Sequence, residues 1–306
     1  MYIIGENIHI ISALVKEAVK ERDIKFFQEL AVKQVEAGAH VLDLNIGPQK
    51  KAGHEIMPWL VKGVQEVTDA PLCLDTTNLT AIEEGLKVAK GQCTINSVSA
   101  EAERLAVVPP LAKKYGAKLV ALTMGKGGIP VSSDERVSIA LETLIPCAME
   151  IGMPMEDLLI DPLVLTVSGC QEYCPECVEA VRTLKFAADP PPMTNVGLSN
   201  VSNAVPREMR PLLNRTYGVM LLAAGVDYMI ADPLDEAQNE FFRIVEERDD
   251  STPVGQVVLT LYDRTVEMEK LTVDDVDMSD PAQADIFKTT QILYNDVIYT
   301  DSYLRV

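Results

Sequence analysis

Short apolar runs alternate with amphipathic segments along almost the whole chain. Each run is only two to four residues long and nearly continuously apolar, as expected for strands of a parallel sheet that is covered on both faces. Eight runs have this character, at residues 2–4, 41–44, 72–74, 94–95, 119–122, 158–160, 196–198 and 228–230.

The segments between the runs have helical periodicity. One helix is predicted to begin after Asp23, a good N-cap residue, and to carry its apolar residues on one face. It is predicted to end at Gly38, because glycine readily adopts the left-handed conformation that closes a helix. Its apolar face would consist of Ile24, Phe27, Leu30, Ala31 and Val35.

The same order of helix end, glycine and strand recurs along the chain. It is clearest at residues 36–45, 114–123, 150–161 and 223–232. Eight degenerate repeats of this kind predict an α/β fold, a (β/α)8 barrel of the TIM type. A doubly wound open sheet is the competing architecture, but no GxGxxG motif follows the first strand.

Residues 233–285 interrupt the repeat. An acidic helix at 235–247 is followed by a segment with Pro and Thr, by VGQVVLTLY, and by TVDDVDMSDP. We interpret this region as an insertion before the last helix, and we expect the amphipathic segment 286–299 to seal the barrel. No linker is evident, so residues 1–306 are expected to form a single domain.

The composition argues against nucleic-acid binding and membrane insertion. The chain has 27 basic and 46 acidic residues, a net charge of −19, which argues against binding to nucleic acid. It has no apolar run long enough to span a membrane, and the sequence MYIIGENIHII lacks the basic segment of a signal peptide. We therefore expect a cytoplasmic protein that does not interact with membranes.

Polar residues are concentrated just after the predicted strands, where the active site of a barrel lies. Carboxylates and carboxamides dominate this set, and together they match a flat heteroaromatic ligand with an amide-like edge, such as a pterin. The set comprises Glu6, Asn7, Asp43, Asn45, Asp75, Asn78, Asn96, Thr123, Lys126, Asp161, Ser199, Asn200, Ser202 and Asp232.

No metal site is expected from the histidines or cysteines. His9, His40 and His54 are scattered, and no HExxH motif is present. Cys170, Cys174 and Cys177 have the C-x3-C-x2-C spacing of a radical S-adenosylmethionine enzyme. They follow the sixth strand instead of the first, however, and open a helix predicted at 174–184. We favour ordinary cysteines of a loop and a helix start.

Six motifs resemble the methyltetrahydrofolate:corrinoid protein methyltransferases. That family consists of pterin-binding barrels with a dihydropteroate-synthase-like fold, akin to the folate domain of cobalamin-dependent methionine synthase. The resemblance covers residues 1 to about 235 and resumes at about 286–303. The motifs are LCLDTTN (72–78), TINS (94–97), LTMGKGGIP (122–130), MPMEDLLIDPL (153–163), VGLSNVS (196–202) and RPLLNRTY (210–217).

The resemblance implies methyl transfer between N5 of tetrahydrofolate and the cobalt of cobalamin, or another corrinoid, carried by a partner protein. It implies that Asp75, Asn96 and Asp161 bind the pterin ring and that Asn200 contacts N5 as the catalytic residue. Ser202 and Arg210 would lie beside the ring, and Lys126 and Ile129 would line the folate. The resemblance also implies a homodimer.

The chain departs from the family pattern in three places. Asn7 and His9 stand where the family often has Arg and Asn in its first motif, and Asn203 stands where a glutamine is usual. Two further residues lie within NAVPREM, between the last two motifs. These departures would change the rim of the pocket or the surface that meets the partner.

Other functions remain open at this point. One is a dihydropteroate synthase, for which no basic pyrophosphate motif follows the eighth strand, and another is a non-catalytic folate-binding component of a corrinoid complex. A radical enzyme is the most distant. The direction of transfer is open too, and includes transfer from methylcorrinoid to tetrahydrofolate in an anaerobic demethylation pathway.

Overall fold

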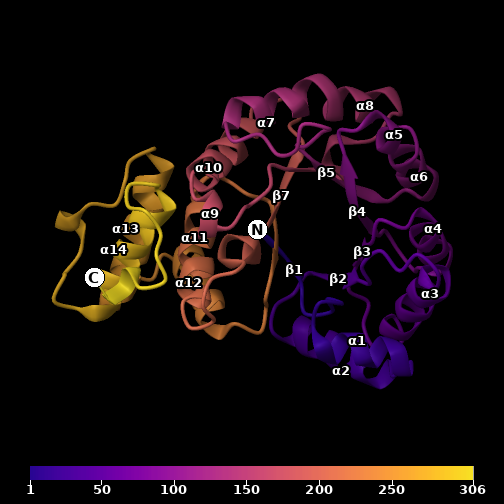
Figure 1. Cartoon of the computed structure of the whole chain (residues 1–306), viewed down its shortest axis with the longest axis horizontal. Helices are drawn as coiled ribbons and strands as arrows, with labels where there is room; N and C mark the ends of the chain where they lie inside the picture. Colours follow the sequence, from indigo (N-terminus) through magenta and orange to yellow (C-terminus); the bar gives the residue numbers. More distant parts are fainter. Residues whose placement is uncertain (306) are drawn as a thin grey trace.

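Eight parallel strands close into a barrel in the order of the sequence, from β1 to β8 and back to β1. The structure is a computed structural model and describes residues 1–305. Figure 1 shows the ring of helices around the barrel. The strands are β1 (Tyr2–Gly5), β2 (Val41–Asn45), β3 (Leu72–Asp75), β4 (Thr94–Ser99), β5 (Lys118–Leu122), β6 (Leu158–Asp161), β7 (Met193–Gly197) and β8 (Tyr228–Ala231).

The helices connect and cover these strands. The π-helical turn Ala140–Leu144 joins α7 to α8, and a 3-10 helix, Leu198–Ser202, follows β7. The α-helices are α1 (Ala13–Glu21), α2 (Ile24–Glu36), α3 (Gly53–Val64), α4 (Leu79–Val88), α5 (Ala102–Leu105), α6 (Val108–Tyr115), α7 (Ser133–Ile139), α8 (Ile145–Glu150), α9 (Val167–Cys170), α10 (Tyr173–Leu184), α11 (Arg210–Ala223), α12 (Glu236–Glu247), α13 (Pro253–Val266) and α14 (Pro281–Leu293).

The barrel predicted from the alternating pattern is confirmed, and each of the eight apolar runs overlaps a strand. The predicted first long helix is α2. Its N-cap Asp23 accepts a hydrogen bond from the Phe26 backbone N–H at 3.3 Å. Gly38 follows the helix with a φ of +102°, a conformation in which a side chain would be strained.

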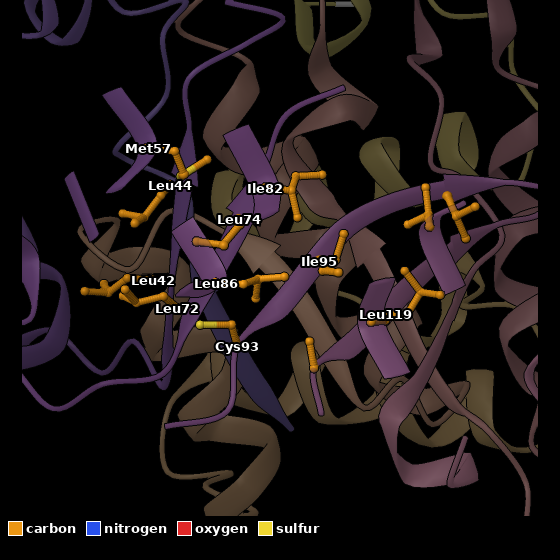
Figure 2. Packing of buried hydrophobic residues seen from close by; sticks show 14 of the residues in the cluster. Leu42, Leu44, Met57, Leu72, Leu74, Ile82, Leu86, Cys93, Ile95 and Leu119 are labelled. Atoms are coloured by element: carbon orange, nitrogen blue, oxygen red, sulfur yellow. The ribbon is translucent and has the colours of Figure 1, made fainter. Parts of the chain in front are cut away.

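Apolar side chains of the strands pack outward against the helices. Figure 2 shows this layer between the first half of the sheet and the helices α3 and α4. Leu74 of β3 and Met57 of α3 are fully buried there, together with Ile82 of α4. Helices cover the outer face of the strands, and a second cluster with Val41, Cys73 and Val120 fills the barrel interior. Because both faces of the strands are buried, the runs in the sequence are continuously apolar.

Shortening Leu74 to alanine is expected to lower the free energy of unfolding by about 2–5 kcal/mol, because a cavity would replace a close-packed side chain. Leu74 has an exposed fraction of 0%. Chemical denaturation measures the change. Leu14 is 71% exposed, so Leu14→Ala is the matched control and should unfold like the parent protein. Equal stabilities of the two variants would contradict the assigned packing.

The C-terminal region differs from the sequence expectation. The range 233–285, interpreted as an insertion, contains α12, which directly follows β8 and packs on α11, where Phe242 meets Gly218. The segment expected to seal the barrel overlaps α14, which packs with α13 on α11, outside the ring (Figure 1). The periodicity of 286–299 is real, but its apolar face covers another helix instead of the sheet.

Candidate active site

A polar cavity of about 270 Å³ opens at the carboxyl ends of the strands. Residues from most of the strands and the loops that follow them contribute to its wall. The wall consists of Glu6, His9, Asp43, Asp75, Asn96, Ser97, Leu122, Asp161, Leu163, Val164, Gly197, Ser199, Asn200 and Ile230. Four carboxyl groups therefore share one small cavity, and the set contains no lysine or arginine.

Three polar side chains lie side by side across β2, β3 and β4. The strand register places Asn45 next to Asp75, and Asp75 next to Asn96. Asp75 Oδ2 accepts hydrogen bonds from Asn45 Nδ2 at 2.5 Å and from Asn96 Nδ2 at 3.3 Å. Burial raises the pKa of Asp75 to about 6, against the opposing effect of the Asn45 hydrogen bond. The carboxyl is thus held in a fixed orientation at the cavity wall.

Asp161 ends β6 on another side of the same cavity. Its Oδ1 accepts a hydrogen bond from the Leu163 backbone N–H at 2.8 Å, and its Oδ2 accepts one from Asn195 Nδ2 at 2.7 Å. Burial raises its pKa to about 6, although both hydrogen bonds favour the ionised form. Asp161 is therefore oriented as firmly as Asp75.

Asp43 is the most deeply buried carboxyl of the cavity. Burial and the nearby Asp75 raise the pKa of Asp43 well above its usual range. Its Oδ1 is buried and has no hydrogen-bond partner among residues 1–305. An unpartnered buried oxygen in a cavity wall costs free energy unless a ligand or water contacts it. Asp43 is thus available to a ligand.

Asn200 lies in the 3-10 helix that follows β7. Its Oδ1 accepts a hydrogen bond from Asn203 Nδ2 at 3.0 Å. Its Nδ2 lies above Gly197, where an added Cβ atom would come within 2.8 Å of it. Glycine at the end of β7 thus provides the space that the Asn200 amide occupies, while Asn203 fixes which way the amide faces.

Glu6 follows β1 and faces Ser199. Ser199 Oγ donates a hydrogen bond to Glu6 Oε1. Burial raises the pKa of Glu6 to about 7, the Ser199 hydrogen bond opposes this rise, and the nearby Asp232 adds to it. Asp232 itself accepts a hydrogen bond from Asn7 Nδ2 at 2.8 Å. Glu6 can therefore exchange its proton near neutral pH.

The raised pKa of Glu6 predicts a pH-dependent stability. Between about pH 4.5 and 7 the folded protein keeps a proton that the unfolded chain has released, so the free energy of unfolding falls as pH rises through this range. Glu6→Gln removes this contribution and is expected to flatten the decline of Tm with pH. Glu21 is exposed, so Glu21→Gln is the control that should keep the slope of the parent. Identical slopes in all three proteins would contradict the assignment.

The structure brings together four of the residues predicted for the site. Asp75, Asn96, Asp161 and Asn200 all line the cavity, although β3, β4, β6 and β7 are far apart in the sequence. This follows from barrel closure, which gathers the carboxyl ends of all strands around one axis.

The other four predicted residues do not line the cavity. Ser202 is buried, and its Oγ donates a hydrogen bond to the Ser199 carbonyl at 3.2 Å. Arg210 Nε donates to the Val205 carbonyl at 2.7 Å. Both support the loop that carries Asn200. Lys126 is exposed and Ile129 is half-buried in the loop after β5, outside the cavity wall.

Several residues of the cavity wall have no role among the site residues predicted from the sequence. Three of them, Glu6, Asp43 and Ser199, do belong to the set of polar residues just after the strands, and this position is the sequence signal that points to them. His9 lies far from the other histidines in the sequence, but its backbone forms a parallel β-bridge with Asn45, and its Nδ1 accepts a hydrogen bond from the Ile11 N–H at 3.1 Å. The apolar wall residues, such as Leu163 and Ile230, gave no signal that separates them from the core.

The cysteines of the C-x3-C-x2-C spacing are separate from the cavity. Cys174 and Cys177 lie on α10 and are buried, and burial raises the pKa of the Cys177 thiol to about 12. Within residues 1–305, no group of three or more His, Cys, Asp or Glu side chains is arranged to hold a metal ion. None of the described helices combines the length and apolar character that a membrane span requires.

A closed β/α barrel with a polar cavity at the carboxyl ends of its strands is the architecture of the TIM-barrel enzymes. Within that class, residues 12–232 match the pterin-binding enzymes. The match spans most of the chain, and the chain belongs to this family.

Two relatives illustrate the sequence similarity. The methylcorrinoid:tetrahydrofolate methyltransferase of Eubacterium limosum is 28% identical over 239 residues, which cover 76% of this chain and 85% of the relative. The methionine synthase of Mycobacterium tuberculosis (strain ATCC 25618 / H37Rv) is 30% identical over 224 residues. That match covers 70% of this chain but only 19% of the longer synthase.

Solved structures show the same fold at lower sequence identity. A dihydropteroate synthase from Thermus thermophilus has a TM-score of 0.55 and 20% identity, and the match covers 72% of this chain and 88% of that one. The Yersinia pestis dihydropteroate synthase has a TM-score of 0.57 and 15% identity, with coverages of 81% and 91%. At these identities the likeness concerns the barrel alone.

Proposed function

We propose that this protein transfers a methyl group between N5 of tetrahydrofolate and the cobalt of a corrinoid carried by a separate protein. The observation that carries the proposal is the cavity itself, in which oriented carboxyl and carboxamide groups surround a space with Asn200 in its wall. The similarity to the Eubacterium limosum methyltransferase supports it.

The donor and acceptor set of the cavity fits a pterin ring. A pterin has an aminopyrimidinone edge that donates N–H groups and accepts at a carbonyl. Carboxylates such as Asp75 and Asp161 can accept from that edge, and a carboxamide such as Asn96 can do both. The unpartnered Oδ1 of Asp43 offers one more contact. We assign pterin binding to Asp75, Asn96 and Asp161, with Asp43 beside them.

The cavity suits a pterin better than a pterin pyrophosphate. A dihydropteroate synthase must bind a pyrophosphate, which needs positive charge close to the reacting atoms. Here the cavity wall has four carboxyl groups and neither lysine nor arginine. Placing a pyrophosphate in this low-dielectric site would bring like charges together at a high cost. This charge balance favours methyl transfer over dihydropteroate synthesis.

In the proposed mechanism the enzyme makes N5 a good leaving group. A neutral tertiary amine leaves poorly, and protonation of N5 lets the electron pair of the N5–methyl bond stay on nitrogen. Cobalt(I) of the corrinoid substrate supplies the electron pair for the new bond to carbon. Asn200 stabilises the charge at N5, because its carboxamide can accept from protonated N5 or donate to the free lone pair.

Glu6 can donate or accept the proton that is transferred in this step. Its pKa of about 7 lets it hold or release a proton at neutral pH, and Ser199 orients it. Ser202 and Arg210 would act indirectly, since both brace the loop of Asn200. We place Lys126 and Ile129 beside the part of the folate beyond the ring, where the exposed Lys126 would attract the glutamate carboxylates.

The proposal also covers the docking face for the corrinoid protein, the oligomeric state and the cellular location. The corrinoid protein would dock over the open end of the barrel, because the cobalt must reach N5 there. We further propose that the enzyme is a cytoplasmic homodimer and that the whole chain forms one domain. Size-exclusion chromatography with light scattering tests the dimer directly.

A product assay separates the proposed function from its pterin-based alternative. The protein is incubated either with methyltetrahydrofolate and cob(I)alamin or with a dihydropterin pyrophosphate and p-aminobenzoate. We expect methylcobalamin and tetrahydrofolate from the first pair and no dihydropteroate from the second. Dihydropteroate formation without methyl transfer would overturn the proposal, and folate binding without either product would favour a non-catalytic role.

A further inference from the structure

A buried arginine lies behind the cavity, outside its wall. Arg136 of α7 has an exposed fraction of 0%, and its Nη2 has no hydrogen-bond partner among residues 1–305. Its guanidinium carbon lies 5.4 Å from the centre of the Tyr173 ring. Burying a charged side chain is costly, so a buried arginine requires compensating contacts.

The contacts of Arg136 join two loops at the carboxyl end of the barrel. Its Nε donates to the carbonyl of Pro130, in the loop after β5, at 3.0 Å. Its Nη1 donates to the carbonyl of Leu163, in the loop after β6, at 3.3 Å. The planar guanidinium can hold both carbonyls at fixed positions because its donors are rigidly spaced.

Leu163 connects this arginine to the cavity. Its carbonyl accepts from Arg136, and its own N–H donates to Asp161 Oδ1 at 2.8 Å. Leu163 has a φ of +72°, a left-handed conformation that is strained for leucine, so its surroundings must hold it there. Arg136 provides one of the contacts that can do so.

The positive charge of Arg136 also acts on Asp161. It lowers the pKa of that carboxyl and so opposes the effect of burial. Cys177 of α10 is the other titratable group close to both residues, and it is a neutral thiol because burial raises its pKa to about 12. The remaining titratable groups of the cavity are Glu6, His9, Asp43 and Asp75, which include no permanent cation.

We propose that Arg136 is a positioning residue that orients Asp161 for the ligand, acting through the Leu163 peptide and through its own positive charge. The inference rests on the proposed function, because it takes Asp161 as the acceptor for a pterin edge. It assigns a role in binding to a side chain that touches neither ligand nor cavity.

The test is the pH dependence of 5-methyltetrahydrofolate binding, measured by calorimetry on the parent protein, Arg136→Met and Arg136→Lys. Without the arginine charge, the midpoint of the binding profile should move to higher pH by about 1 unit. Because the pKa of Asp161 is about 6 in the parent protein, Arg136→Met should bind about 3-fold more weakly near pH 6.5 and about 10-fold more weakly near pH 5, and it should recover nearly all of the loss at about pH 8.5. Arg136→Lys keeps the charge and should keep the midpoint, with a loss that is uniform across pH.

A matched control distinguishes this role from general stability. Arg182 lies on α10, donates to the Thr265 carbonyl at 2.8 Å, and is absent from the cavity wall. Arg182→Met should leave the binding profile unchanged. A parallel loss at every pH in Arg136→Met would overturn the positioning role while leaving the proposed function intact. No binding by the parent protein at any pH would overturn the proposed function itself.

Discussion

Asn200→Ala is expected to lower the rate of methyl transfer by about 10²–10³-fold while the affinity for methyltetrahydrofolate changes little. Asn200 stabilises charge that develops at N5, so its contribution belongs to the transition state more than to the bound ground state. Single-turnover rates and calorimetric affinities, measured on the same protein, separate the two effects.

The neighbouring Asn203 supplies a graded control for this experiment. Asn203 Nδ2 donates to Asn200 Oδ1 at 3.0 Å and has no place in the cavity wall. Asn203→Ala should lower the rate by a smaller factor, since it frees the Asn200 amide without removing it. Equal losses of affinity and rate in Asn200→Ala would contradict the transition-state role.

Asp75→Ala is expected to weaken methyltetrahydrofolate binding by about 10²-fold, or roughly 3 kcal/mol. The substitution removes an oriented acceptor for the pterin edge and leaves the amides of Asn45 and Asn96 without their partner. Equilibrium titration of the folate under anaerobic conditions measures this change. The rate at saturating folate should fall much less than the affinity.

An aspartate at the opposite end of the same strand serves as the control. Asp69 is exposed and lies before β3, on the side of the barrel away from the cavity. Asp69→Ala should bind methyltetrahydrofolate like the parent protein. Unchanged binding in Asp75→Ala would mean that the pterin does not occupy the cavity.

The strands could be predicted because their physical requirements are local. A strand covered by helices must be apolar on its outer face, and Leu42, Leu44, Leu72 and Leu74 meet that requirement. The order of strands then follows from the repeat. The C-terminal helices could not be placed in this way, because an amphipathic pattern shows that a helix has a buried face without showing what covers it.

The site could be predicted only in part, because the sequence does not show in which direction an individual side chain points. Asp75 and Asp161 end their strands, and the barrel turns both toward one axis. Asn200 and Ser202 share one short 3-10 helix, yet Asn200 lines the cavity while Ser202 faces the protein interior. Local turn geometry decides such cases. The role of Leu163 depends on its left-handed backbone conformation, which cannot be predicted from the sequence because leucine rarely adopts it.

Anaerobic spectroscopy of cobalamin in the presence of the protein tests the central claim most directly. Methyltetrahydrofolate is mixed with cob(I)alamin, and separately tetrahydrofolate with methylcobalamin, while the cobalt spectrum is followed. We expect protein-dependent conversion in at least one direction, abolished or strongly slowed in Asn200→Ala. A spectrum that stays unchanged in both directions, with the folate bound in the cavity, would contradict the account.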